Sequence, residues 1–281
     1  MQIHEVACMY ADLDNKLVVV KFSGGKDSTA SLLYMLMNYR VDYVLYQHIP
    51  DNMLPEAKDY ISSLADAIMD DTGKKFNLVI LESEPMLKLM REKHKPFPTP
   101  KTLWCSYWLK VVPSKRWIKN IASKHGLAEE QVVVVVGVKK SDSRRRSELY
   151  KDKLIKADKI RTRFKGVSYG EKYYMFFPIL DWTDEQVWNY IKKFPNTYKI
   201  LKHQYKSYYN ITQCLVCPFH SRKYYESLPL KTLIKIHELL IDIEKMDHIT
   251  NFRMGYAFLQ RHKRIVEDIL NKHGVKVVDN D

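Results

Sequence analysis

The fold is decided by residues 16–28, which read KLVVVKFSGGKDS. Residues 16–22 are rich in β-branched apolar side chains, which predicts a buried strand. This strand runs directly into the Gly-rich turn 23–28, and residues 27–38 then show apolar side chains at helical spacing. A strand, a tight turn and a helix in immediate succession form a cradle for an anion, because backbone N–H groups and the positive end of the helix converge on the turn.

The composition of the turn predicts that the anion is a phosphate. Two adjacent glycines let the backbone bend tightly, a lysine adds a full positive charge, and two serines can donate hydrogen bonds. The predicted phosphate-binding residues of the turn are Ser23, Gly24, Gly25, Lys26 and Ser28, and the predicted catalytic residues are Lys26, Asp27 and Ser28. The GxxxxGK[ST] spacing is absent, so the turn is not a Walker A loop.

The remainder of the first 195 residues alternates strand and helix patterns. Further strands are predicted at 42–49, 78–81, 132–138 and 173–179, and further helices at 55–69, 113–125 and 183–193. This alternation predicts a doubly wound α/β domain with a parallel sheet over residues 1–195. Residues 196–281 form a second region with a CxxC segment and two or three helices between 229 and 273. The basic stretch 139–165 shows no clear periodicity and is predicted to be a mobile or ligand-ordered loop.

Composition and charge restrict the partners of the chain. Hydrophobic residues make up 46% of the 281 residues, which excludes disordered and collagen-like classes. Lys and Arg number 46 against 33 Asp and Glu, and the net charge of +13 predicts attraction to polyanions such as nucleic acid. No apolar run reaches the roughly 18 residues of a membrane span, and no leader pattern opens the sequence. We therefore expect a cytoplasmic protein with no membrane partner.

Three of the four cysteines form a candidate metal site. Cys214 and Cys217 make a CxxC pair followed by proline, a spacing that chelates one metal or two corners of an iron–sulfur cluster. Cys105 lies more than a hundred residues earlier, so only the fold can bring it to the pair. Zinc held by these cysteines with His220 is an alternative, and three unligated buried thiols are another.

The turn SGGKDS between a strand and a helix resembles the phosphate loop of the PP-loop ATP pyrophosphatases. Three further segments are similar to the phosphoadenosine phosphosulfate (PAPS) reductases: WCSYWLKVVP at 104–113, GVKKSDSRRR at 137–146 and PILDWTDEQVW at 178–188. The four motifs are colinear and span roughly residues 16–220. The resemblance implies an adenine nucleotide alpha hydrolase-like fold that binds ATP with Mg²⁺. It also places Gly137, Lys139 and Arg144 among the nucleotide-binding residues.

The iron–sulfur members of the family have a Cys-Cys pair before their CxxC and hold a [4Fe–4S] cluster. Here Ser106 stands at the second position of the pair, so three thiolates remain. The resemblance implies a cluster whose fourth iron is bound by Ser106, by an outside ligand or by none. An open iron would suit a cluster-dependent sulfurtransferase.

Two departures put the reductase substrate in question. The reductases carry a nucleophilic cysteine in a Glu-Cys-Gly-x-His segment, and no cysteine follows Cys217 in this sequence; the reductase segment Leu-Asp-Thr-Gly is replaced by QHIPDN at 47–52. We therefore expect a sulfurtransferase that adenylates tRNA, DNA or a nucleotide, releases pyrophosphate and then transfers sulfur. Its sulfur or electron donor would be a cysteine desulfurase or a thioredoxin-like protein.

Two alternatives remain open from the sequence: a sulfonucleotide reductase that uses an external thiol, and a nucleotide- or nucleic-acid-binding protein without turnover. Basic residues for nucleic acid are present at 144–146 and 151–165 and in the tail. Tyr205, Tyr208 and Tyr209 are candidates for stacking on bases.

Overall fold

The computed structural model describes residues 13–160, 171–207 and 213–275. The chain divides into two compact units, of which the first comprises Met1–Gln47, Lys58–Leu81 and Ser114–Lys202 and the second comprises His48–Ala57, Glu82–Pro113 and His203–Asp281. The sequence suggested a single boundary after residue 195. The second unit instead also includes two short segments from the first 195 residues.

The first unit is built on a mixed sheet. Within the described residues its six strands lie in the order β3-β2-β1-β4-β6-β5. The strands are β1 (Leu17–Lys21), β2 (Tyr43–His48), β3 (Asn77–Glu82), β4 (Val132–Val136), β5 (Leu154–Lys156) and β6 (Tyr174–Phe176). β1 pairs in parallel with β2 and β4, and β4 pairs in parallel with β6. The predicted α/β fold is confirmed, with one correction: β5 runs antiparallel to β6.

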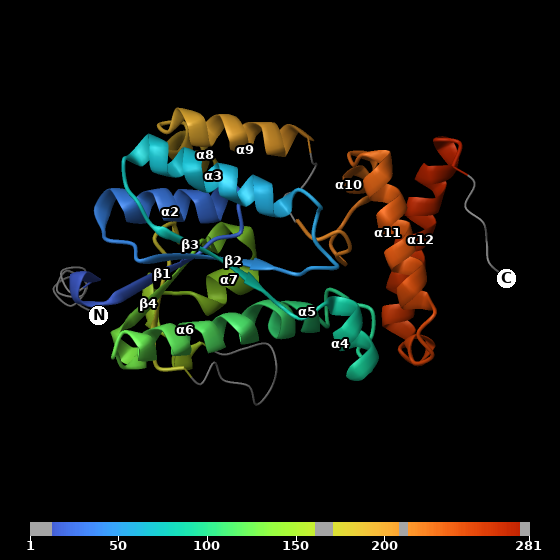
Figure 1. Ribbon diagram of the computed structural model, residues 1–281, viewed down its shortest axis with the longest axis horizontal. Coiled ribbons are helices and arrows are strands. Elements are labelled where there is room, and N and C mark those ends of the chain that lie inside the picture. The colour runs from blue at the N-terminus through green and yellow to red at the C-terminus, as the bar shows by residue number, and fades with distance from the viewer. Residues whose placement is uncertain (1–12, 161–170, 208–212, 276–281) are drawn as a thin grey trace. The chain divides into compact units, whose positions relative to one another are not determined.

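Helices cover both faces of this sheet (Figure 1). The helices with most of their residues in the first unit are α2 (Lys26–Asn38), α3 (Ala57–Thr72), α6 (Val112–Lys124), α7 (Arg144–Leu149), α8 (Asp184–Ile191) and α9 (Pro195–Ser207). Leu17 and Val19 of β1 pack in one apolar cluster with Ile118 and Ala122 of α6. Val18, on the other face of β1, is fully buried as well. Coverage on both faces explains why β1 and β4 are apolar throughout instead of alternating.

The prediction of an irregular loop at 139–165 is wrong for its described part, residues 139–160. A short 3-10 turn (Lys140–Asp142), helix α7, strand β5 and a second 3-10 turn (Ala157–Lys159) follow one another there. β5 is three residues long and is an edge strand whose one neighbour is β6. So short a strand leaves no periodic pattern in the sequence, because pairing with a distant strand decides its conformation.

The second unit is helical in its described residues. Its elements are α4 (Met86–Glu92), α5 (Trp104–Ser106), a π-helical turn (Tyr107–Val111), α10 (Arg222–Glu226), α11 (Leu230–Glu244), a 3-10 turn (Ile249–Asn251) and α12 (Arg253–Lys272). α11 and α12 lie side by side (Figure 1) and bury apolar residues such as Ile236 and Val266 between them. The helical tail is thus as predicted. In the described part of the chain, no helix is long and apolar enough to span a bilayer.

The strand order fixes where a ligand can bind in the first unit. β1 and β4 are neighbours, and the chain continues from β1 to β2 on one side and from β4 to β5 and β6 on the other. In open α/β sheets, ligands bind at the carboxyl ends of the strands where the order reverses in this way. The phosphate loop follows β1 and the segment that begins with Gly137 follows β4, so both predicted nucleotide-binding segments leave the sheet at this switch point.

Candidate functional site

The phosphate loop is held in shape by its own hydrogen bonds. Gly24 has a φ of 73°, a conformation that glycine adopts at no cost, and its carbonyl accepts a hydrogen bond of 2.6 Å from the Tyr60 hydroxyl. The Ser28 hydroxyl donates to the carbonyl of Gly25 at 2.9 Å and accepts from the N–H of Ser23 at 3.2 Å. The loop is therefore a preformed turn at the start of α2.

Gly137 contacts the phosphate loop so closely that no residue with a side chain fits at this position. A Cβ atom added at Gly137 would lie 2.6 Å from the carbonyl oxygen of Asp27 and 2.8 Å from the Cα of Ser28. The end of β4 is therefore pressed directly against the backbone of the phosphate loop. This close approach, which needs glycine, carries the following residues to the loop.

Two lysines and three aspartates meet beside the loop. Lys139 is fully buried, and its Nζ lies 2.7 Å from Asp27, 2.9 Å from Asp142 and 2.7 Å from Asp184. Lys26 Nζ lies 2.9 Å from Asp27 and 3.0 Å from Asp184. Both predicted phosphate-binding lysines thus point at one place, and carboxylates neutralise them there.

The ionisation of this cluster follows from the contacts. Burial alone would lower the pKa of Lys139, but hydrogen bonds to Asp184, Asp27 and Asp142 outweigh it and raise the pKa above its usual value. The hydrogen bond from Lys139 lowers the pKa of Asp184, which Lys26 lowers further. Lys139 is therefore charged at neutral pH, as a phosphate site requires.

Asp184 is a residue of this cluster that the sequence did not identify. Thr183 and Gln186 cap the start of α8, and Asp184 is the first residue of that helix. Its side chain is 66% exposed, yet one of its oxygens bridges the ammonium groups of Lys26 and Lys139. The loop and α8 are more than 150 residues apart, so no local pattern could reveal the contact. An incoming phosphate has to compete with this carboxylate.

Arg144 is not brought into the cluster. It is the first residue of α7, its side chain is 94% exposed, and its Nε pairs with Glu148 at 2.9 Å. The neighbouring Lys140 pairs with Asp181 at 2.7 Å. A role for Arg144 in nucleotide binding therefore stays a prediction. Of the tyrosines, Tyr205 is half-buried on α9, whereas Tyr208 and Tyr209 lie outside the described residues.

The second unit brings the three predicted cysteines around one cation. Cys105, Cys214 and Cys217 are partly buried, and Lys110 Nζ lies 3.7 Å from the sulfur of Cys214. Electrostatic interaction with Cys214 raises the pKa of Lys110 against the effect of burial, and Cys105 and Cys217 add to this. Lys110 lies on the π-helical turn, a rare element that is frequent at functional sites.

Burial keeps two of these thiols protonated. Burial and the neighbouring Cys214 raise the pKa of Cys105 to about 11 and that of Cys217 to about 12. Because a raised pKa favours the protonated thiol, both groups are poor nucleophiles at neutral pH in this arrangement. They become reactive only when a charge is brought close, a metal displaces the proton or the segment opens.

The described residues do not present a ready metal site. Among them, no group of three or more His, Cys, Asp and Glu side chains could hold a metal ion. Ser106, a predicted fourth ligand, is exposed. His220, the other, is buried and stacks on Tyr224 at 3.7 Å, and burial lowers its pKa to about 3. A [4Fe–4S] cluster or zinc ion does not fit this arrangement without rearrangement, and both stay predictions.

Asn52 holds the CxxC loop in place. Its amide group donates to the carbonyl of Val216 at 3.1 Å and accepts from the Val216 N–H at 2.8 Å, and all of these groups are buried. The Asn52 carbonyl also accepts from the Leu215 N–H at 3.2 Å. Asn52 lies in QHIPDN, the segment where the sequence departs from the reductase pattern. That departure was the available signal, and its structural meaning is a clamp on the residues between the two cysteines.

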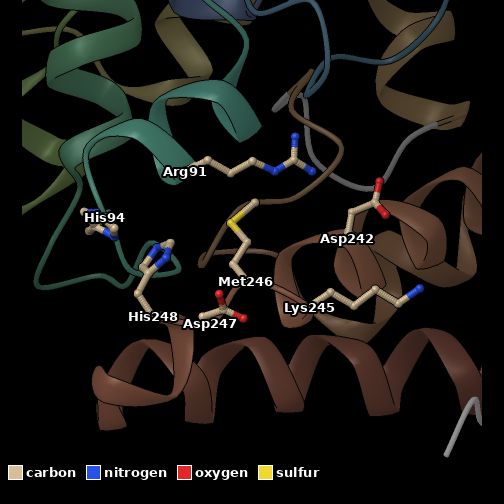
Figure 2. A pocket seen from close by; sticks show the side chains of 7 residues that line it. All are labelled: Arg91, His94, Asp242, Lys245, Met246, Asp247 and His248. Carbon is tan, nitrogen blue, oxygen red and sulfur yellow. The ribbon is translucent and has the colours of Figure 1, made fainter.

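A hollow of about 420 Å³ lies at the ends of α4 and α11 (Figure 2). It is lined by Arg91, His94, Asp242, Lys245, Met246, Asp247 and His248. The rings of His94 and His248 meet edge to face at 5.0 Å, and His248 Nε2 is hydrogen-bonded to the carbonyl of Lys95 at 3.2 Å. Six of its seven lining residues have charged or polar side chains, and the sequence analysis did not identify the hollow.

This fold and loop have the layout of a PP-loop domain, and comparison with known proteins identifies its family. The family described as phosphoadenosine phosphosulfate reductase domain matches residues 17–211. The chain therefore belongs to the PAPS reductase domain family.

Similar proteins include two from Methanocaldococcus jannaschii. The uncharacterized protein MJ0066 is 25% identical over 217 residues, covering 72% of this chain and 36% of the relative. The uncharacterized protein MJ0973 is 27% identical over 206 residues, covering 73% of this chain and 42% of the relative. The chain thus spans about two fifths of the length of these relatives. Among solved structures, a 4-thiouridine synthetase–RNA complex with bound ATP matches with a TM-score of 0.45 and 16% identity, over 82% of this chain and 53% of that chain.

Replacement of Asp184 by asparagine is expected to tighten ATP binding about fivefold, because the phosphates then no longer compete with a carboxylate for the two ammonium groups; the contact is largely exposed, which keeps the gain this small. Isothermal titration calorimetry at fixed Mg²⁺ measures the change. Glu185→Gln is the matched control, since it removes the same charge from the next, exposed residue. Weaker binding by Asp184→Asn, or equal effects of both variants, would contradict the assignment.

Replacement of Asn52 by alanine leaves two buried backbone groups of Val216 without partners. We expect the variant to lose about 2 kcal/mol of unfolding free energy, measured by urea denaturation. Iodoacetamide labelling of Cys214 and Cys217 at pH 8 should accelerate as the CxxC loop loosens. Asn38→Ala is the control, because Asn38 makes one exposed hydrogen bond to the carbonyl of Tyr34. Unchanged stability and labelling would show that Asn52 does not hold the loop.

Proposed function

We propose that the protein is an ATP-dependent sulfurtransferase that adenylates an acceptor on a nucleic acid or nucleotide and then replaces the activated oxygen by sulfur. The observation that carries the proposal is the convergence of Lys26 and Lys139 on one place at the carboxyl end of β1 and β4. Membership of the PAPS reductase domain family supports the same nucleotide chemistry.

The first step is nucleotidyl transfer. An acceptor oxygen attacks the α-phosphorus of ATP, the bond between that phosphorus and the oxygen bridging to the β-phosphate breaks, and pyrophosphate leaves with the electron pair. The phosphate loop, Lys26 and Lys139 would stabilise the negative charge that develops on the leaving pyrophosphate. Mg²⁺ would enter with the nucleotide, since this ion is held mainly by substrate phosphates and one or two carboxylates. Asp27 of the phosphate loop is the carboxylate placed to contribute.

The second step is displacement of AMP by sulfur. The terminal sulfur of a cysteine persulfide attacks the activated carbon, the carbon–oxygen bond breaks, and AMP leaves. A second cysteine then attacks the disulfide that joins enzyme and product, which releases the thiolated product and leaves a protein disulfide. A cysteine desulfurase would supply the persulfide sulfur, and a thioredoxin-like protein would reduce the disulfide. Cys105, Cys214 and Cys217 are assigned to this step because they surround Lys110.

Two observations favour two other functions, a sulfonucleotide reductase and a binding protein without turnover. The matched family is described by its PAPS reductase domain, which supports a sulfonucleotide reductase working with an external thiol. Thioredoxin-dependent release of sulfite from PAPS would identify that activity. The bridging position of Asp184 fits a protein that binds nucleotide or nucleic acid without turnover. Binding of ATP without pyrophosphate release from any acceptor would identify it.

The decisive experiment is pyrophosphate release from ATP and Mg²⁺ with bulk tRNA, sheared DNA or free nucleotides as acceptors. Lys26→Ala is expected to lower the rate at least about 100-fold, because it removes a cation aimed at the leaving group. Lys88→Ala, which removes an exposed lysine paired with Glu84, should leave the rate unchanged. Absence of pyrophosphate release from the natural sequence with every acceptor, or a fully active Lys26→Ala variant, would refute adenylation by this loop.

Metal analysis of anaerobically purified protein decides the chemistry of the three cysteines. A brown protein with matched iron and acid-labile sulfide would indicate a cluster, and a colourless protein with one zinc ion would indicate a structural site. A metal-free protein with three titratable thiols would support the persulfide route.

A further inference from the structure

Two exposed aromatic side chains lie in the two segments that carry the cysteines. Within the described residues, the large apolar side chains that are mainly in solvent are Met37, Trp108, Phe219, Leu230, Ile234, Phe252 and Met254. Single exposed apolar residues are common on proteins. Trp108 and Phe219 are different, because they are 43% and 58% exposed and each lies within three residues of a cysteine.

The indole ring of Trp108 contacts the ring of Tyr107 and the ammonium group of Lys95. Trp108 lies three residues after Cys105, on the π-helical turn that also carries Lys110. The Tyr107 ring meets it edge-on at 5.4 Å and 85°, and Lys95 Nζ lies 5.7 Å from the centroid of the indole ring. A large aromatic surface is thereby presented to solvent beside a positive charge.

Phe219 lies in the CxxC segment, two residues after Cys217. Its backbone N–H donates a hydrogen bond to the sulfur of Cys217, and this contact opposes the rise in the pKa of that thiol. The turn is closed by the His220 N–H, which donates to the Cys217 carbonyl at 3.0 Å. The ring therefore projects into solvent from a backbone that contacts the sulfur. Lys110 Nζ lies 3.7 Å from the sulfur of Cys214, and Cys105 and Cys217 are close enough to act on the same ammonium group. The two segments that carry the rings therefore meet at Lys110.

We propose that Trp108 and Phe219 are a stacking platform for an unpaired base of single-stranded nucleic acid, which they hold beside the three cysteines. The proposal rests on the proposed function and narrows its acceptor to a base out of the duplex. Aromatic rings beside lysines are the means by which proteins bind single strands, because every base has a π face and every nucleotide a phosphate. Lys95 and the net charge of +13 supply the complementary charge. An apolar protein partner would instead require a continuous apolar patch.

Lys95 links the hollow of Figure 2 to Trp108. The Lys95 carbonyl is hydrogen-bonded to His248 in the wall of the hollow, while the Lys95 ammonium lies over Trp108. Arg91 extends into the hollow and makes no ion pair or hydrogen bond with the described residues. The hollow, at about 420 Å³, has room for a nucleotide adjacent to the stacked base, with Arg91 available for its phosphate.

The test is the affinity of the full chain for a fluorescein-labelled twelve-nucleotide oligo(U), measured by fluorescence anisotropy over a range of salt concentrations. Trp108→Ala and Phe219→Ala should each weaken binding about tenfold without changing the salt dependence, because they remove stacking and no charge. Lys95→Ala should lower the slope of log affinity against log salt by about one. Trp108→Phe should restore most of the affinity. Leu230→Ala, an exposed apolar residue on α11, is the control and should bind normally.

The outcomes separate this proposal from the function on which it rests. ATP binding is measured on the same variants and should be unchanged, which also reports that the nucleotide-binding unit has folded. Trp108→Ala and Phe219→Ala variants that bind oligo(U) like the natural sequence would overturn the platform, even with pyrophosphate release intact. Equal losses of affinity for a hairpin duplex would also overturn it. If the natural sequence releases no pyrophosphate but Trp108→Ala and Phe219→Ala still weaken oligo(U) binding, only the enzymatic proposal is refuted.

Discussion

The buried ammonium of Lys139 is the constraint on which the nucleotide-binding unit depends. A charge without solvent exposure is stable only with partners, and Asp27, Asp142 and Asp184 provide them from the phosphate loop, the turn after β4 and the start of α8. The contact exists only because Gly137 lets the end of β4 approach the loop backbone. One ion cluster therefore fixes three separate segments at the switch point of the sheet and places two cations where a nucleotide phosphate can bind.

In the second unit as well, a lysine contacts residues from segments that are distant in sequence, and here the partners are cysteine sulfurs. Lys110 is a cation among three sulfurs, and its partners come from two segments that are distant in sequence. The Asn52 amide fixes the loop between Cys214 and Cys217 through both backbone groups of Val216. Buried polar networks of this kind need every member satisfied, which makes them specific and sensitive to substitution. The exposed rings of Trp108 and Phe219 are attached to this rigid frame, which suits the binding of a ligand that approaches from solvent.

Much of the fold was predictable, and the residues show why. The runs of valine in β1 and β4 indicate strands covered on both faces, and the capping sequence Thr183-Asp184-Glu185-Gln186 marks the start of α8. The phosphate loop was identified because its chemistry is local: glycines, a lysine and serines in one turn. By contrast, β5 was missed because edge pairing with β6 decides it. The contacts of Asp184, Lys110 and Asn52 were missed because each joins segments distant in sequence.

The sequence by itself determined the α/β class, the phosphate loop and the set of cysteines, because strand periodicity, turn chemistry and residue type act over a few neighbouring residues. Only the tertiary structure decided which lysines meet which carboxylates, that Arg144 lies apart from the cluster, and that the cysteines surround Lys110 without forming a group that holds a metal in the described residues. Charges and sulfurs act through distances of a few ångströms, and only the packing of strands and helices sets these distances between residues far apart in the chain.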